Sequence, residues 1–180
     1  KKVGAKFGVA TNSATSALHI AYMALDLREG DWLWTCPNTF VATTNAAVFC
    51  GAKVDFVDID ENTFNIDVNL LEAKLDEASK KNILPKIVVP VHLAGQSPDL
   101  KRIYELSKQY GFKVVEDASH SIGAKYEDYY VGNCQYSDIT VFSFHPVKII
   151  TTGEGGIALT NNKELQKRLT LHRSHGITSS

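Results

Sequence analysis

Short apolar segments alternate with amphipathic segments along the whole chain. Seven segments rich in β-branched and aromatic residues predict strands, at residues 7–11, 32–35, 54–57, 87–91, 112–115, 139–144 and 156–160. Helices are predicted where apolar residues recur three and four positions apart, at residues 14–25, 37–50, 68–78, 98–110 and 163–171. This alternation, with short connections, predicts an α/β fold in which a mostly parallel seven-stranded sheet is flanked by helices.

Residues suited to chemistry follow four of the predicted strands. Ser13 to Thr15 follow the first strand, His92 the fourth, Asp117 and His120 the fifth, and Ser143 to Lys148 the sixth. In an open α/β sheet, ligands bind beyond the carboxyl ends of the strands. We therefore expect one site at this edge of the sheet.

Lys148 is the first candidate for catalysis. It follows a buried strand that Pro146 interrupts, and the glycines between Gly153 and Gly156 allow the backbone to approach a ligand closely. A lysine that is partly removed from water by such a turn can act as a Schiff-base nucleophile. The alternative is a solvated loop lysine, so other parts of the chain must decide.

Two further segments help to decide between a Schiff-base lysine and a solvated loop lysine at position 148. Ser13 to Thr15 lie where a strand turns into a helix, which suits either a phosphate-binding turn or a simple helix cap. Asp117 could be a metal ligand, a base, a structural cap or the partner of a cofactor ring nitrogen. A lysine, a carboxylate and a phosphate-binding turn at one sheet edge together suit pyridoxal 5'-phosphate.

Composition and other motifs exclude several classes. The net charge is −1 and the charged fraction is 22%, so the chain has no electrostatic signature for nucleic acid or an anionic membrane. No apolar run reaches the ~20 residues of a membrane span. Cys36, Cys50 and Cys134 form no C-x-x-C pair, which favours a reducing compartment and hence the cytoplasm.

Motifs of other enzyme classes are missing or incomplete. The segment Gly153 to Gly156 lacks the third glycine of the dinucleotide fingerprint and leads into a strand rather than a helix. The sequence contains neither a P-loop nor the G-x-S-x-G elbow of hydrolases. His172 and His175 are not accompanied by an H-E-x-x-H motif or a cysteine cluster, so we expect no metal site.

Five segments in a fixed order carry a family resemblance: Asn12–Leu18, Thr39–Thr43, Glu116–His120, Ser143–Lys148 and Thr151–Gly156. Together they resemble the DegT/DnrJ/EryC1/StrS sugar aminotransferases, which are pyridoxal-phosphate enzymes of the aspartate-aminotransferase fold, fold type I. The resemblance covers nearly all 180 residues. It is strongest to the branch that acts in pseudaminic-acid biosynthesis.

The resemblance implies a role for each candidate residue. Lys148 would form the Schiff base with the cofactor, and Asp117 would pair with its pyridine nitrogen; these are the predicted catalytic residues. His120 occupies a position where many relatives carry a glutamine near the phenolic oxygen of the cofactor. The remaining predicted cofactor-binding residues hold the phosphate or stack on the ring: Ser13, Ala14, Thr15, Ser143 and Phe40.

The resemblance also implies a reaction. A UDP-linked 4-keto-6-deoxy sugar would be aminated with L-glutamate as the donor, in a homodimer with a shared active site. Lysine rather than histidine at position 148 favours transamination over the dehydration that some relatives perform. The alternatives are another fold-type I enzyme such as a sugar dehydratase, a non-catalytic cofactor-binding regulator, or a structural role without cofactor. His92 could line the site or be structural, and His145 could face substrate or a second subunit.

Members of this family are considerably longer than this chain. The sequence begins at Lys1 without an initiator methionine and ends at Ser180. We therefore expect residues 1–180 to form the cofactor-binding large domain of a longer aminotransferase, without its N-terminal segment and C-terminal small domain.

Overall fold

A seven-stranded sheet organises the computed structural model, which describes residues 2–177. Its strands, in spatial order, are β1 (Phe7–Thr11), β9 (Gly156–Thr160), β8 (Ile139–Ser143), β5 (Lys113–Asp117), β4 (Ile87–Val89), β2 (Trp32–Thr35) and β3 (Lys53–Phe56). Only β9 runs against its neighbours, because it pairs antiparallel with both β1 and β8. The other neighbouring pairs are parallel, which confirms the predicted mostly parallel sheet.

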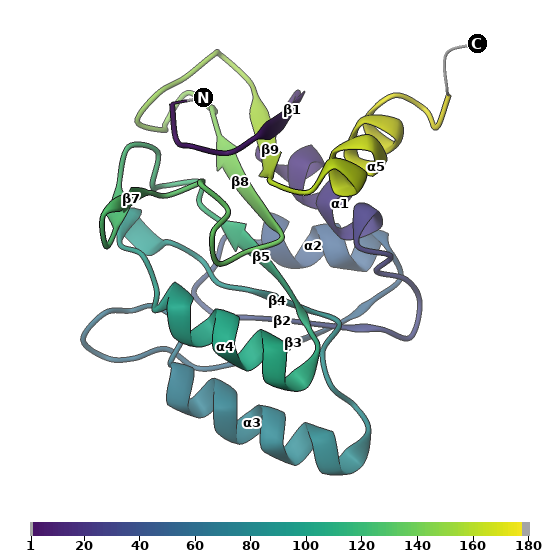
Figure 1. The fold of residues 1–180 in the computed structure, drawn as a ribbon, viewed down its shortest axis with the longest axis vertical. Helices are drawn as coiled ribbons and strands as arrows, with labels where there is room; N and C mark the ends of the chain where they lie inside the picture. Colours follow the sequence, from purple (N-terminus) through teal and green to yellow (C-terminus); the bar gives the residue numbers. More distant parts are fainter. Residues whose placement is uncertain (1, 178–180) are drawn as a thin grey trace.

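Within residues 2–177, five α-helices cover the two faces of this sheet (Figure 1). They are α1 (Ala14–Ala24), α2 (Ala42–Phe49), α3 (Val68–Lys81), α4 (Leu100–Tyr110) and α5 (Lys163–Arg173), with a short 3₁₀ turn η1 at Leu93–Gly95. Helices α1, α2 and α5 pack on one face, and α3 and α4 pack on the other. The molecule is therefore the expected α/β layer structure.

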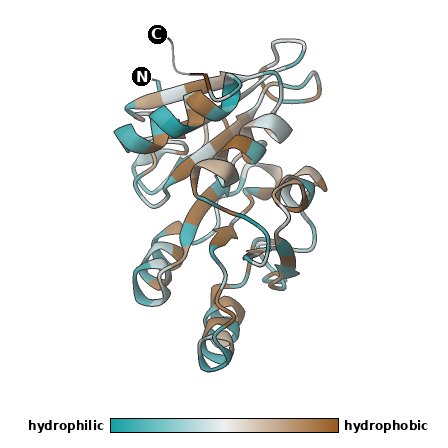
Figure 2. Cartoon of the chain, turned by 90° about the vertical axis from the view of Figure 1, so that its right-hand side faces the viewer, coloured by the Kyte–Doolittle hydropathy of each residue, from teal (hydrophilic) through white to brown (hydrophobic). Residues whose placement is uncertain are grey.

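The alternation of side chains along the strands divides the core between the two faces. Ile87 and Val89 belong to the core with α1, whereas Val88, between them, belongs to the core with α3 and α4. The same division separates Val115 from Val114. Strands buried on both faces read as continuous apolar runs in the sequence, and several strand segments are brown in Figure 2.

Side-chain caps begin the helices largely where the sequence indicated. The hydroxyl of Ser13 accepts a hydrogen bond from the backbone N–H of Ser16 at the start of α1. Asn162 caps α5 in the same way, and Gly111 ends α4 with a φ of 82°. The interpretation of the Ser13 segment as a helix cap is thus supported.

Three local predictions are wrong. Helix α2 starts at Ala42 rather than near residue 37, because Asn38 instead donates its side-chain amide to the carbonyl of Phe64 in a neighbouring loop. Helix α4 starts at Leu100, because the Asp99 side chain caps it and places Pro98 before the helix. The strand predicted at 87–91 is shorter, since β4 ends at Val89.

The turn η1 and one hairpin were not predicted. A two-stranded hairpin, β6 (Lys125–Tyr126) and β7 (Tyr129–Tyr130), lies outside the main sheet. Val131, which follows it, packs with Phe142 of β8 in a third apolar cluster. Within residues 2–177, no helix combines the length and the hydrophobicity that crossing a bilayer would require.

Candidate active site

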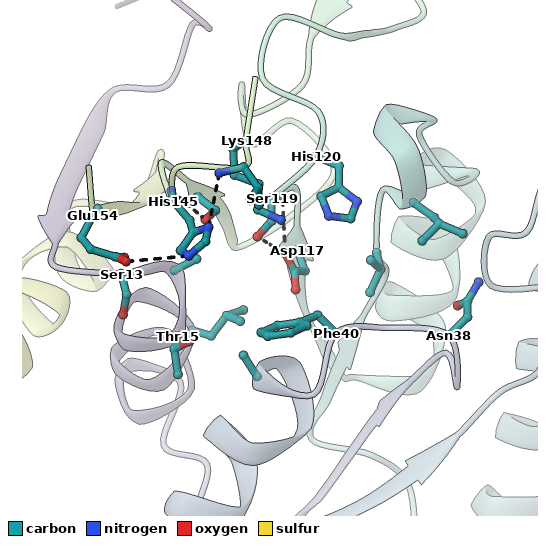
Figure 3. A pocket seen from close by; sticks show the side chains of 18 residues that line it. Ser13, Thr15, Asn38, Phe40, Asp117, Ser119, His120, His145, Lys148 and Glu154 are labelled. Carbon is teal, nitrogen blue, oxygen red and sulfur yellow. Dashed lines mark hydrogen bonds and ion pairs between the residues drawn. The ribbon is translucent and has the colours of Figure 1, made fainter. Parts of the chain in front are cut away.

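A cavity of about 490 Å³ opens at the carboxyl ends of β1, β5 and β8 (Figure 3). The predicted site residues all line it: Ser13, Ala14, Thr15, Phe40, Asp117, His120, Ser143 and Lys148. Residues up to 135 positions apart, from Ser13 to Lys148, thus meet at one place, as the parallel sheet predicted. The placement is a structural result, and the role of each residue remains a prediction.

Lys148 lies in the turn that follows β8 and is half-buried. Its backbone N–H donates to the carbonyl of His145 at 2.9 Å. The two ends of the loop are tied together, because Phe144 donates its N–H to Gly155 and its carbonyl accepts from the N–H of Thr152. The amine is therefore carried by a closed loop rather than by a free one.

Asp117 ends β5 with a side chain that is almost fully buried. One carboxylate oxygen accepts a hydrogen bond from the hydroxyl of Thr43 at 2.7 Å. The other accepts from the hydroxyl of Ser119 at 2.6 Å and from its backbone N–H at 3.2 Å. These donors fix the orientation of a carboxylate that still borders the cavity.

The N-terminus of α1 reaches the cavity through Ser13 and Ala14. Gly156 of β9 packs directly beneath this turn: a Cβ on Gly156 would lie 2.3 Å from the carbonyl oxygen of Ser13 and 2.5 Å from the nitrogen of Ala14. Only glycine permits this approach. With the hydroxyls of Thr15 and Ser143 nearby, the exposed backbone N–H groups form a site suited to a phosphate.

Apolar side chains and an unused acceptor complete the wall. Phe40 is 71% exposed and Val147 is 79% exposed, although both line the cavity. A large aromatic side chain at such a position can stack on a flat ring. Asn38 also lines the cavity, and its Oδ1 atom is the one buried side-chain oxygen or nitrogen among residues 2–177 without a hydrogen-bond partner.

His120 is partly buried and lies beside Lys148 and Asp117 (Figure 3). Burial lowers the pKa of its imidazole, the positive charge of Lys148 lowers it further, and Asp117 opposes the shift. The Nδ1 atom accepts a hydrogen bond of 3.3 Å from the backbone N–H of Ala94. The ring therefore favours its neutral form.

His92 does not line the cavity, which supports the structural interpretation. Its ring is fully buried, with Nε2 2.9 Å from Glu116 and Nδ1 3.2 Å from the hydroxyl of Ser97. Burial opposes ionisation of Glu116, but hydrogen bonds from His92, Ser137 and Thr140 outweigh it and lower the pKa of this carboxyl. His145, by contrast, is exposed, lines the cavity and lies 3.7 Å from Glu154.

Thr43 and Ser119 were missed as individual site residues, although both fall in segments that carry the family resemblance. Neither has a type that is diagnostic alone, and their role depends on contact with a carboxylate up to 74 residues away. Asn38 was also missed, because its hydrogen bond to the carbonyl of Phe64, 26 residues later, has no local signal in the sequence. In the part of the chain that the structure describes, no group of three metal-binding side chains was found.

Comparison with known proteins places this geometry in a family. The model of the DegT/DnrJ/EryC1/StrS aminotransferase family matches residues 1–180. The UDP-4-amino-4,6-dideoxy-N-acetyl-beta-L-altrosamine transaminase of Campylobacter jejuni is 47% identical over 175 residues, covering 97% of this chain and 45% of the relative. The spore coat polysaccharide biosynthesis protein SpsC of Bacillus subtilis is 40% identical over 178 residues, covering 99% and 44%.

Solved structures of aminotransferases are also similar to this chain. Helicobacter pylori PseC, an aminotransferase involved in pseudaminic-acid biosynthesis, superposes with a TM-score of 0.89 at 35% identity, covering 99% of this chain and 46% of that one. S. venezuelae DesV in complex with a ketimine intermediate gives 0.87 at 30% identity, covering 98% and 46%. The chain thus spans less than half the length of these relatives. With its whole length matched, this chain belongs to the DegT/DnrJ/EryC1/StrS aminotransferase family.

Proposed function

We propose that the protein containing this chain is a pyridoxal-phosphate-dependent aminotransferase that aminates a UDP-linked 4-keto-6-deoxy sugar with L-glutamate as donor. Residues 1–180 would form its cofactor-binding large domain. One observation carries the proposal: Lys148 and the buried carboxylate of Asp117 border the same cavity as the N-terminus of α1. These are the three attachments that pyridoxal phosphate needs.

The residues present fit this cofactor. The backbone N–H groups at the start of α1, with the hydroxyls of Ser13, Thr15 and Ser143, would hold the phosphate. Gly156 supports this assignment, because the absence of a side chain there allows the backbone of the turn at Ser13 and Ala14 to pack closely against β9. Phe40 would stack on the ring, and Asp117 would pair with the ring nitrogen.

Bound in this cavity, pyridoxal phosphate would supply an electron-withdrawing ring that makes the proton on the α-carbon of the amino donor acidic. Asp117 would keep the ring nitrogen protonated through a charge-assisted hydrogen bond. The amine of Lys148 would act as general base toward the α-proton of the amino donor and would return a proton as general acid. The same residue would work in the reverse direction when the keto sugar accepts the amino group.

The sugar assignment rests on the relatives. The 47% identity to a transaminase of a UDP-linked amino sugar supports a UDP-sugar of the pseudaminic-acid pathway. Cys36, Cys50 and Cys134 are free thiols, which supports action in the cytoplasm.

A homodimer is part of the proposal. Apolar side chains remain exposed at the cavity and beside it in the sequence: Phe40 and Val147 line the cavity, and Val41, Ile149 and Ile150 lie next to them in the chain. Contiguous exposed apolar residues indicate an interaction surface. A second subunit that covered them would also shield the amine of Lys148 from water.

The experiment is an absorbance spectrum of the protein with pyridoxal phosphate, before and after L-glutamate, followed by a panel of keto-sugar nucleotides. We expect glutamate to remove the visible-range band and to release 2-oxoglutarate, and a UDP-linked 4-keto sugar to restore the band. A spectrum that glutamate leaves unchanged would indicate a cofactor-binding regulator. Loss of the sugar 3-hydroxyl without gain of nitrogen would indicate a dehydratase.

A further inference from the structure

The short turn η1 contacts His120 and contributes Leu93 to the wall of the cavity. The backbone N–H of Ala94 donates to Nδ1 of His120, and a Cβ on Gly95 would lie 3.1 Å from the carbonyl oxygen of His120. Ala94 has a φ of 52°, in the left-handed region that a residue with a side chain rarely adopts. Such a conformation persists only where the surroundings hold it.

Two buried polar side chains hold this turn. Asn65, which is 2% exposed, accepts from the N–H of Leu93 through Oδ1 and donates to the carbonyl of Gln96 through Nδ2. His92, immediately before the turn, is anchored to Glu116 of β5. The turn is thereby tied to the sheet at one end and to a neighbouring loop along its length.

A hydrogen bond from an N–H to Nδ1 has one chemical consequence for a neutral imidazole. The nitrogen that accepts cannot carry the proton, so the proton lies on Nε2. Lys148 and Asp117 are the charged groups that act on this ring, and the stronger influences, burial and Lys148, favour the neutral form. The ring then offers a donor at Nε2 and no second donor at Nδ1.

We propose that the turn formed by Leu93, Ala94 and Gly95 is a positioning element that fixes His120 as the neutral Nε2–H tautomer and presents this N–H to an oxygen of the ligand in the cavity. The tautomer itself follows from the hydrogen bond to Ala94. The part that concerns the ligand rests on the proposed function. Asn65 and His92 act through the turn, without touching the ligand cavity.

The test reads the tautomer directly, in protein without cofactor. Long-range ¹H–¹⁵N spectra of ¹⁵N-histidine-labelled protein at neutral pH distinguish the two nitrogens, and a His120→Asn variant identifies the signals of His120. We expect Nδ1 to show the shift of an unprotonated acceptor and Nε2 that of a protonated donor. A proton on Nδ1 of the wild-type protein, or averaging of both tautomers as in free imidazole, would overturn the proposal before any variant of the turn is made.

Two variants then test the turn. Gly95→Ala places a methyl group against His120, and Asn65→Ala removes both bonds that hold the turn. Both should convert the His120 signals to averaged tautomers. Gly30→Ala is the matched control, because Gly30 has a φ of +89°, close to the +92° of Gly95, but nothing within 4 Å of an added Cβ. Signals in both test variants that match the wild type would contradict a role for the turn.

The same variants separate this proposal from the proposed function. If the protein is an aminotransferase, Gly95→Ala should lower kcat about tenfold with cofactor still bound, and Gly30→Ala should not. Unchanged kcat in Gly95→Ala, despite averaged tautomers, would remove the ligand part of the proposal. Absence of any transamination by the wild type would refute the proposed function and leave the tautomer result standing.

Discussion

The carboxylate of Asp117 accepts a hydrogen bond of 2.7 Å from the hydroxyl of Thr43, although the two residues are 74 positions apart in the sequence. Thr43 lies in the first turn of α2, and its carbonyl accepts a hydrogen bond from the buried hydroxyl of Tyr22 in α1. The orientation of a strand-end carboxylate thus depends on two helices from the opposite half of the chain. This contact links the packing of one layer to the chemistry of the site.

Replacement of Asp117 by asparagine should preserve the shape of the site and remove its negative charge. The variant should bind pyridoxal phosphate and turn over about 10²–10³ times more slowly, the range seen when a preorganised electrostatic partner is removed. Steady-state kinetics at saturating cofactor measure this, with Asp128→Asn in the exposed hairpin as control. Turnover within a factor of two of the wild type would exclude a role for the charge.

Thr43→Val tests the orientation of the same carboxylate. Valine has nearly the same shape as threonine but cannot donate to Asp117, so one carboxylate oxygen loses its hydrogen bond. We expect kcat to fall about tenfold, which corresponds to roughly 1.4 kcal/mol of barrier. Thr43→Ser restores a hydroxyl and should recover most of the loss. If serine and valine behave alike, packing rather than the hydrogen bond is responsible.

Gly156→Ala should reduce both the stability of the fold and the binding of pyridoxal phosphate, although it adds only one methyl group. Its Cβ would meet backbone atoms of Ser13 and Ala14, which cannot move without disturbing the start of α1. We expect a loss of about 2–3 kcal/mol in the free energy of unfolding, as for overpacking in general, together with weaker binding of pyridoxal phosphate. Chemical denaturation and spectral titration of the cofactor measure the two effects.

Gly8→Ala is the control for this substitution. Gly8 lies in the neighbouring strand β1, and an added Cβ there would meet only the side-chain ends of Leu159 and Ile157, which can shift. Its effect on stability should be smaller and its effect on cofactor binding negligible. If Gly156→Ala changed stability and cofactor binding as little as Gly8→Ala, the turn at Ser13 would tolerate the extra atom.

The buried pair of Glu116 and His92 should govern part of the acid sensitivity. The pKa of Glu116 in the folded protein lies below its usual 4.5. Ionised Glu116 therefore contributes fully to the free energy of unfolding at pH values above 4.5. This contribution is lost as the pH falls through the lowered pKa. Glu116→Gln should therefore destabilise the protein by about 3 kcal/mol near pH 7, and the difference from the wild type should shrink on acidification.

Urea unfolding at a series of pH values checks this prediction. Glu77→Gln on the exposed face of α3 should stay within about 0.5 kcal/mol of the wild type. A difference between Glu116→Gln and the wild type that is constant from neutral to acidic pH would show that the charge of Glu116 makes no contribution.

The sequence contained enough information for the sheet and for the edge where the site lies. A parallel strand that is buried on both faces needs apolar residues at consecutive positions, so a run such as Ile87 to Val89 can be recognised as a strand from the sequence. Lys148, Asp117 and Ser13 could be found because each lies at or shortly after the carboxyl end of a strand. Helix α2 was misplaced because the hydrogen bond between Asn38 and Phe64, which has no local signal, holds its expected first turn in a loop.

Partners across the fold could not be predicted. Nothing near Ala94 in the sequence indicates that its N–H would meet His120, 26 residues later, and a non-glycine residue with positive φ is not readable from composition. The hairpin of β6 and β7 was missed because its strands have two residues each, too few for an alternation to be recognised.

The most direct test of the account is to reduce the complex with borohydride and locate the attached pyridoxyl group by peptide mass spectrometry. Reduction makes a Schiff base permanent, so the account predicts the label on the peptide that contains Lys148. Lys148→Ala should lose the label and the visible absorbance, while Lys80→Ala on exposed α3 should retain both. A label on another lysine, or no covalent label in a protein that transaminates normally, would contradict the assignment of Lys148.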